Sequence, residues 1–181
     1  HAMERIAETK WYWEPRGDTI HHALEYQMNQ RFNPNPPPNL KAPVPGECPK
    51  TGRSYDEWID PLLSDPLWDE VQVVGTEIMG YSTRRNVAGT ADLVLRFPAD
   101  NTYGIADLKT QSEKSSGKYC TKSQLGAGVE MVGDHYRLPM SRCLTLWSQP
   151  GRLVIQTHQA QDCLDTWFDT CVAYETNHRP F

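Results

Sequence analysis

The chain has no long hydrophobic run, and none of its 181 residues belongs to a stretch near the 18 or more apolar residues that span a bilayer. A basic and then apolar leader is missing as well. We therefore expect a soluble protein inside the cell, cytoplasmic and without a membrane partner. Residues 1–3 look like the remnant of a cleaved expression tag, so residues 4–181 are expected to form a single domain with a real hydrophobic core.

Cysteine is scarce, and the spacing of the cysteines is not typical of a disulfide framework. Five cysteines, an odd number, lie at positions 48, 120, 143, 163 and 171, and no two form a C-x-x-C pair. This spacing argues against both a disulfide framework and a structural zinc site. We expect reduced cysteines, mostly buried as small hydrophobic side chains.

An excess of positive charge is also absent. The formal net charge of −5 does not by itself indicate a nucleic-acid-binding protein. Residues 109–122, however, contain four lysines and a single acid, Glu113. A basic groove on an acidic body would attract a phosphate backbone through its local field. Solvated surface lysines are the alternative interpretation.

Hydrophobic periodicity predicts a helix over 17–30, capped by Asp18 or Thr19, with His21 at the edge of its apolar stripe. Seven of the fourteen prolines lie in 33–53, which excludes regular structure there and indicates a tether or a functional loop. Short helical turns follow, interrupted by prolines.

In the rest of the chain the hydrophobic residues recur with a period of 2 in some segments, as in strands, and of 3.6 in others, as in helices. Strands are predicted over 71–81, 87–97, 102–110, 142–148 and 152–158, and helices over 122–136 and 160–176. The inner face of the last helix is predicted to hold Leu164, Trp167, Phe168, Cys171 and Val172. The order α-βββ-α-ββ-α predicts an α/β protein whose central mixed β-sheet is flanked by helices.

The stretch "GIADLKT" at 104–110 places an acid and a lysine near the end of a predicted strand. Asp107 and Lys109 are two residues apart, so both side chains leave the same face, which Ile105 shares. A carboxylate there can bind a divalent metal, and a lysine beside it can stabilise charge on a phosphoryl oxygen. Asp92, on the neighbouring strand, can supply a second oxygen ligand. A surface Asp–Lys pair is the alternative when D-x-K is taken alone.

Four short motifs in order resemble the PD-(D/E)XK nuclease superfamily, most closely its RecB-like and Cas4-like exonucleases, which include the mitochondrial genome maintenance exonuclease. "RGDTIHHALE" resembles the first-helix motif, with the histidine at His21, and "GTE" places Glu77 where this group often has an acid. "GTADLVLR" matches the strand with Asp92, and "IADLKT" matches the strand with Asp107 and Lys109. The resemblance covers roughly residues 15–130 and implies a restriction-endonuclease-like core.

The same resemblance implies a site that binds Mg²⁺ or Mn²⁺. Its metal ligands would be His21, Asp92, Asp107 and the backbone carbonyl of Leu108, and its catalytic residues Lys109, Asp107, Asp92 and Glu77. Glu77 has three possible roles: a ligand, a group that orients water, or a partner for Lys109. His22 is the alternative to His21, but it points about 100° away around the helix, so only one can face the site.

The sequence departs from the group's pattern at two places. The helix after D-x-K usually has the pattern Q-x-x-x-Y; here Gln124 is present, as a predicted contact to substrate or lysine, and Gly128 stands in place of the tyrosine. Cas4-like members also hold an iron–sulfur cluster that needs a cysteine before the histidine helix. The first cysteine here is Cys48, so we expect no cluster.

Five basic residues are predicted to contact DNA phosphates: Arg84, Arg85, Lys114, Lys118 and Lys122. The alternatives are a solvated hairpin tip for the arginines and plain solubility for the lysines. The aromatic run "WYW" at 11–13 either stacks on unpaired bases or, in the preferred interpretation, packs in the core.

The sequence therefore predicts a metal-dependent DNA nuclease that hydrolyses phosphodiester bonds, an exonuclease acting on DNA ends or single strands. Its size suits a phage or recombination enzyme. One alternative is a structure- or sequence-specific endonuclease on the same fold, which would also cut closed circles. Another is a non-catalytic nucleic-acid-binding module, against which the intact Asp92, Asp107 and Lys109 argue.

Overall fold

The computed structural model describes residues 2–112 and 119–178, with side chains over 8–112 and 119–177. Five strands form one sheet in the order β1-β2-β3-β4-β5. They are β1 (Gln72–Ser82), β2 (Val87–Phe97), β3 (Thr102–Thr110), β4 (Met140–Gln149) and β5 (Arg152–Gln159). β3 and β4 run parallel and the other neighbours antiparallel, so the predicted mixed sheet in an α/β fold is confirmed.

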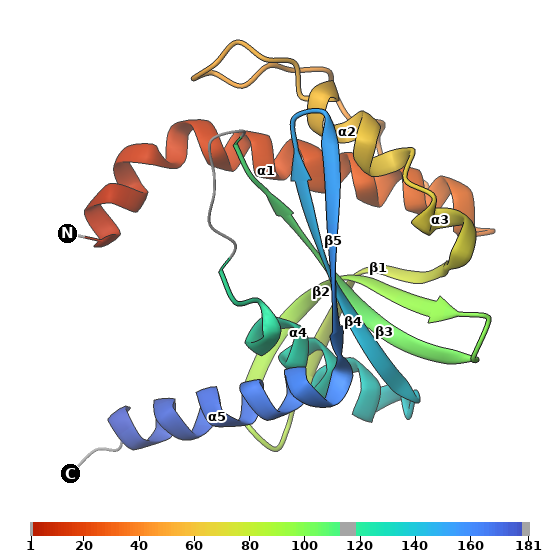
Figure 1. Cartoon of the computed structure of the whole chain (residues 1–181), viewed down its shortest axis with the longest axis vertical. Helices are drawn as coiled ribbons and strands as arrows, with labels where there is room; N and C mark the ends of the chain where they lie inside the picture. Colours follow the sequence, from red (N-terminus) through yellow and green to blue (C-terminus); the bar gives the residue numbers. More distant parts are fainter. Residues whose placement is uncertain (1, 113–118, 179–181) are drawn as a thin grey trace.

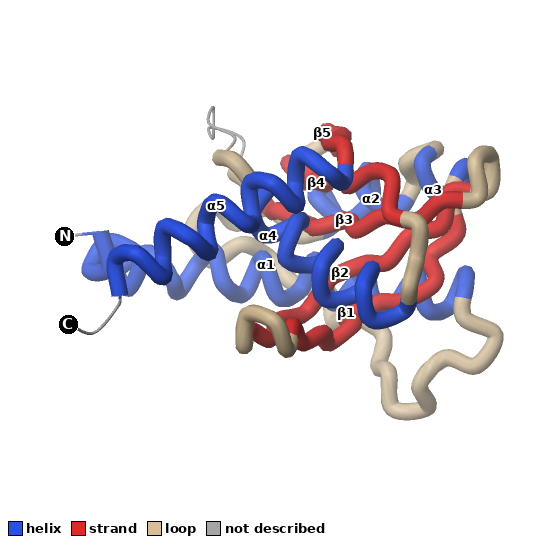
Figure 2. The backbone as a smooth tube through the Cα atoms, turned by 90° about the horizontal axis from the view of Figure 1, so that it is seen from below, coloured by secondary structure: helices blue, strands red, loops and turns tan. Residues whose placement is uncertain are grey.

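Helices cover both faces of the sheet (Figure 1). One face carries α1 (Ala2–Phe32), α2 (Asp56–Leu63) and α3 (Leu67–Glu70), and the other α4 (Lys122–Gly128), the π-helix η1 (Val129–Asp134) and α5 (Ala160–His178). The first part of α1 and the last part of α5 project beyond the sheet on the same side (Figures 1 and 2). Across the described ranges, no helix combines the length and apolar character needed for a membrane span.

The sheet divides the hydrophobic core into two clusters, because neighbouring residues of a strand face opposite sides. On β3, Ala106 and Leu108 pack toward α1 and α2, whereas Ile105 packs toward α4 and α5. Asp107 and Lys109 alternate along the strand with Ala106 and Leu108. Their side chains therefore lie on the same side of the sheet as Ile105. The predicted common face of these three residues therefore looks toward α4.

The first helix begins earlier than predicted. It starts at Ala2 and passes through Pro15, so neither Asp18 nor Thr19 is its cap. Thr19 Oγ1 instead donates to the carbonyl of Pro15 at 2.7 Å. A proline removes one helical N–H, which here interrupts the ladder locally without ending the helix.

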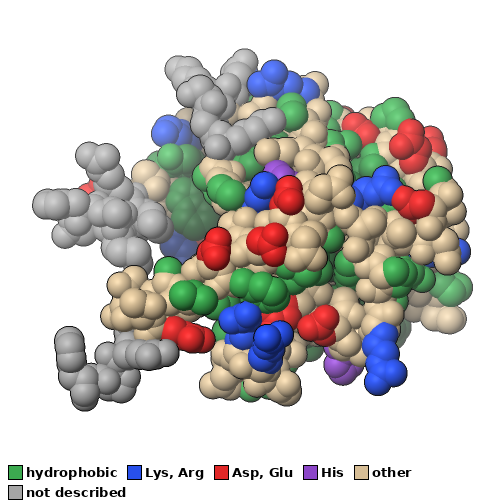
Figure 3. Space-filling view, turned by 60° about the horizontal axis from the view of Figure 1, so that its bottom comes forward, with side chains coloured by type: hydrophobic (Ala, Val, Ile, Leu, Met, Phe, Trp, Pro, Cys, Tyr) green, Lys and Arg blue, Asp and Glu red, His purple; other side chains and the backbone are tan. Residues whose placement is uncertain are grey.

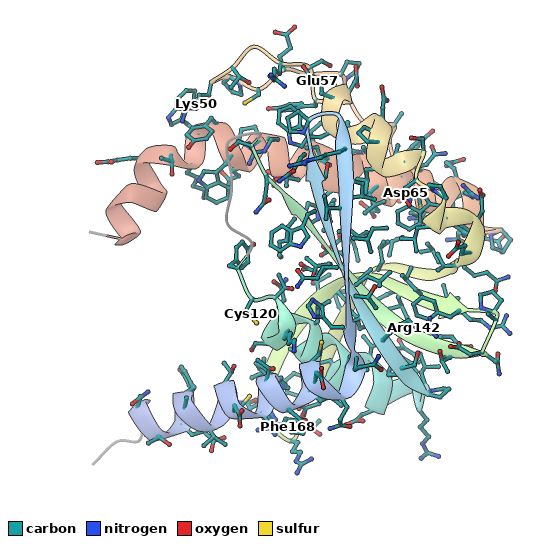
Figure 4. The ribbon with its side chains drawn as sticks, viewed as in Figure 1. Lys50, Glu57, Asp65, Cys120, Arg142 and Phe168 are labelled. Carbon is teal, nitrogen blue, oxygen red and sulfur yellow. The ribbon has the colours of Figure 1, made fainter. Side chains whose placement is uncertain are left out.

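The aromatic run at 11–13 does not pack in the core as a unit. Trp11 is 56% exposed and Trp13 37% exposed, so the preferred core interpretation is wrong for both. The ring of Tyr12 lies 4.3 Å from the ammonium of Lys50, which extends over α1 from the proline-rich segment (Figure 4). That segment is irregular, as predicted, and it enters the core at Cys48, as does Tyr55 just after it.

The last helix buries fewer of its predicted residues than expected. Val172 is 60% exposed, and the helix enters the core through Ala160 and Cys163 instead. It packs closely on α4, where a Cβ added at Gly126 would lie 2.0 Å from the carbonyl oxygen of Cys163. The cysteine prediction is confirmed: all five are free, and only Cys120, labelled in Figure 4, is exposed.

Arg85 belongs to a buried network and not to a phosphate site, which corrects its predicted role. Its Nε donates to Glu130 Oε2 at 3.0 Å, and its guanidinium lies 4.5 Å from the ring of Phe168 on α5 (Figure 4). Glu130 also accepts hydrogen bonds from Ser82 and Trp167. Burial acts to raise the pKa of Glu130, but its three hydrogen-bond donors outweigh burial and lower it.

We expect Arg85→Ala to lower the free energy of unfolding by about 3 kcal/mol, because it leaves the buried Glu130 without its cation. Arg84→Ala, at the neighbouring exposed position, should change it by less than about 0.5 kcal/mol. Urea unfolding of both variants measures the difference. Equal stability of the two variants would show that the pair does not hold the β1–β2 hairpin against η1.

Candidate metal centre

The centre lies where the ladder between β2 and β3 stops. Their last pair is Leu93 with Ala106, and beyond it β3 pairs only with β4. The N–H of Leu108 donates to Asp92 Oδ2 at 2.8 Å instead of to the β2 backbone. In an extended strand the N–H and C=O of one residue point to the same side, so the Leu108 carbonyl also faces Asp92.

Three side chains from three elements converge at this point. His21 of α1, Glu77 of β1 and Asp92 of β2 each offer one ligand atom, and these atoms lie within 4.8 Å of one another. His21 Nδ1 is 3.6 Å from Asp92 Oδ2. Glu77 lies opposite Asp92, because the residues on either side of it pair with those flanking Asp92. One imidazole and two carboxylates form a donor set that suits Mn²⁺ or Mg²⁺.

The backbone of Glu77 is unusual for a strand. Its φ of 49° lies in the left-handed region, which residues other than glycine seldom adopt. Such conformations cost energy and persist only where the surrounding structure holds them, often at functional sites. At Glu77 this backbone lies beside Asp92 and His21.

The carboxylates of the centre repel one another. Burial and then the charges of Asp92 and Glu25 raise the pKa of Glu77 to about 7. Much of the surface of Glu77 is nevertheless accessible to solvent. Burial and then the charge of Asp92 raise the pKa of Asp107 to about 6, against the opposing effect of Lys109. A cation at this point would relieve the repulsion, so the residues present fit a divalent metal.

Lys109 is held beside the centre by two acceptors. Its Nζ donates to Asp107 Oδ1 and to Gln124 Oε1, each at 2.9 Å. Asp107 Oδ2 lies 2.8 Å from Nζ, and this buried atom accepts no hydrogen bond from any described residue. Of the two contacts predicted for Gln124, the structure therefore contains the one to the lysine.

The close group differs from the predicted ligand set in one member. Glu77 belongs to it, whereas Asp107 lies next to it with its carboxylate against Lys109. Of the two histidines, His21 lies at the centre, because it faces Asp92. His22 Nδ1 lies 3.7 Å from Glu25 instead.

The other residues predicted to contact the substrate are Lys122, Arg84, Lys114 and Lys118. Lys122 is the first residue of α4, and its Nζ lies 3.7 Å from Asp162 of α5. Arg84 is exposed at the hairpin turn. Lys114 and Lys118 lie outside the described residues. At Gly128 an added Cβ would lie 3.1 Å from Ile105 Cγ2, so a tyrosine there would require Ile105 to move.

Two cavities adjoin the centre. One, of about 330 Å³, is lined by Asp92, Asp107, Gln124 and residues of α4 and β2. The other, of about 510 Å³, lies on the α1 side and includes His21, Glu77 and Lys109. Its further lining residues Arg16 and Tyr119 were missed from the sequence, where Arg16 opens the first-helix motif but was given no role and Tyr119 belongs to no motif. We call this second cavity the α1 cleft.

We expect Mn²⁺ to raise the melting temperature more at pH 8 than at pH 6, because Glu77 and Asp107 must lose their protons to favour a cation. Both pKa values are raised by folding, so in the metal-free protein their contribution to stability is present below the ordinary carboxyl pKa. It is lost as pH rises through about 6 for Asp107 and about 7 for Glu77. Thermal melts with and without Mn²⁺ measure this, and Glu77→Gln should weaken the pH dependence. Equal Mn²⁺ shifts at the two pH values would contradict the protonation argument.

No family model matches the chain, and no curated protein does. Among solved structures, one described as "Crystal structure of SSO0001" is similar to it with a TM-score of 0.36 and 14% sequence identity. The similarity covers 64% of this chain and 55% of that one, so the chain spans about half the length of that structure.

Proposed function

We propose that the protein is a metal-dependent DNA nuclease that hydrolyses phosphodiester bonds, as a PD-(D/E)XK exonuclease acting on DNA ends or single strands. The observation that carries this proposal is the convergence of His21, Glu77 and Asp92 directly beside a lysine held by Asp107. A simple surface Asp–Lys pair would not require a histidine or two further acids around it.

His21, Glu77 and Asp92 would hold Mg²⁺ or Mn²⁺, with the Leu108 carbonyl on the same side. A divalent metal bound there supplies positive charge at a phosphoryl oxygen and makes water a stronger nucleophile at neutral pH. The backbone N–H of Leu108 fixes the direction of the Asp92 carboxylate. Asp92 is thus oriented before substrate arrives, which is what preorganised electrostatic stabilisation requires.

Lys109 would stabilise the negative charge that develops on the phosphoryl group. An ammonium has three N–H donors, and among the described residues two of them go to Asp107 and Gln124. The third is then available for a phosphate oxygen or the attacking water. The Asp107 carboxylate accepts a hydrogen bond from the lysine and holds it in place.

The test is a time course on linear single-stranded DNA labelled at the 5′ or the 3′ end, with Mg²⁺, Mn²⁺ or EDTA, beside closed circular DNA. We expect both metals to support release of short products, EDTA to prevent it and the circles to remain intact. Cut circles would favour the endonuclease alternative. An absence of cleavage with either metal would contradict the proposed function.

A further inference from the structure

The α1 cleft contains two exposed aromatic side chains that the proposed chemistry does not use. Trp13 of α1 is 37% exposed, and Tyr119 is 60% exposed on the segment before α4. The Tyr119 ring lies edge-on against Trp147, with 5.3 Å between the ring centroids, so a buried partner positions it. The volume of about 510 Å³ suits a nucleotide-sized group, since small-ligand sites span roughly 300–1,000 Å³.

The polar lining of the cleft connects these aromatics to the candidate metal centre. Arg16, one turn beyond Trp13, is buried, and its Nη2 donates to the carbonyl of Thr110 at 3.3 Å. Thr110 follows Lys109 on β3, so this contact joins the aromatic part of α1 to the strand that carries the lysine. His21, Glu77 and Lys109 line the same cleft.

The charges of the described residues that line the cleft do not attract a phosphate backbone by themselves. Among these residues three acids, Glu14, Asp18 and Glu77, outnumber two bases, Arg16 and Lys109. A phosphate is attracted only after a divalent cation has bound, and further affinity has to come from uncharged parts of the substrate. Aromatic side chains provide it, because every unpaired base offers a π-face for stacking.

The helix α5, on the face of the sheet opposite α1, differs from the cleft in its charge. The described part of α5 carries four acids and no lysine or arginine, at Asp162, Asp165, Asp169 and Glu175. Figure 3, which views the face that includes α5, shows acidic side chains with basic side chains of other elements beside them. The described part of α5 therefore offers a phosphate backbone no basic side chain of its own.

We propose that the α1 cleft binds single-stranded DNA, with unpaired bases stacked on Trp13 and Tyr119 and a backbone phosphate at the candidate metal centre. This inference rests on the proposed function and adds its substrate class. Within a duplex the base faces are covered by neighbouring base pairs, so duplex DNA away from its ends cannot stack on the two aromatic side chains.

The test measures binding apart from turnover. Ca²⁺ replaces Mg²⁺, and fluorescence anisotropy follows a single-stranded oligonucleotide of about 12 nucleotides. We expect Trp13→Ala to weaken binding by about tenfold or more, and Trp13→Phe to retain most of it. Trp11→Ala is the matched control, because Trp11 is exposed on the same helix but does not line the cleft. 2-Aminopurine in the oligonucleotide should be quenched by the parent protein, and less by Trp13→Ala.

The inference is overturned if Trp13→Ala binds the single strand as tightly as the parent, if 2-aminopurine is not quenched, or if the parent binds duplex equally well. Each result leaves the proposed function standing where the parent still cleaves DNA with Mg²⁺. A parent that cleaves no DNA would instead overturn the proposed function, and the anisotropy titration would still decide whether the cleft binds single strands.

Discussion

Asp92→Asn abolishes metal-dependent cleavage in our account, with a loss of activity of about 10³-fold or more. Asp92 is the one residue of the centre that contacts both His21 and the N–H of Leu108. Asparagine still offers an oxygen to that N–H, so the strand geometry is retained while the charge is removed. Several kcal/mol of charge stabilisation depend on the bound cation, and each 1.36 kcal/mol is tenfold in rate. The initial rate on single-stranded DNA with Mn²⁺ measures the effect.

Asp165→Asn is the control for this experiment, because Asp165 is an exposed acid of α5 away from the centre. It should cleave DNA at the parental rate. The Asp92 variant should also have lost the pH-dependent stabilisation by Mn²⁺, which a defect in DNA binding alone would not cause. Cleavage by Asp92→Asn within a few-fold of the parent would show that Asp92 does not hold the metal.

Lys109→Met should lower kcat by about 10²- to 10³-fold while the affinity for DNA changes little. This is the range seen when one preorganised donor to a developing negative charge is removed. The ammonium is in place before substrate binds, because Asp107 and Gln124 accept from it. Single-turnover rates and anisotropy titrations separate the two quantities.

Removal of Lys109 also leaves the Asp107 carboxylate buried without its cation, which destabilises the fold. The double variant Lys109→Met with Asp107→Asn removes that charge and should recover stability without recovering activity. Activity that returns with stability would assign Lys109 a structural role. Unchanged kcat in the folded fraction of the single variant would contradict a catalytic role as well.

The fold was predictable because most of its elements are amphipathic. Period-2 patterns predict β2 and β3, and the three apolar residues of "GIADLKT" lie in the core clusters as the alternation requires. The beginning of α1 was not predictable from Asp18 or Thr19. A cap signal is local, whereas the helix continues through Pro15.

The sequence predicted most of the residues of the candidate site, but not how these residues are arranged in space. The motif order singled out His21, Asp92 and Lys109, but the pairing of carboxylates depends on the register of β1 with β2 and on where the β2–β3 ladder stops. Neither is encoded in a short motif, so Glu77 was assigned three roles. Arg85 shows the converse: its ion pair with Glu130, 45 residues away, is a tertiary contact that a turn motif does not reveal.

The most direct measurement is the anomalous scattering of manganese in crystals grown with Mn²⁺. Our account predicts a single strong peak bounded by the imidazole of His21 and the carboxylates of Glu77 and Asp92, near the ammonium of Lys109. A peak elsewhere, or none at millimolar Mn²⁺ and pH 8, would contradict the metal centre and with it the proposed nuclease.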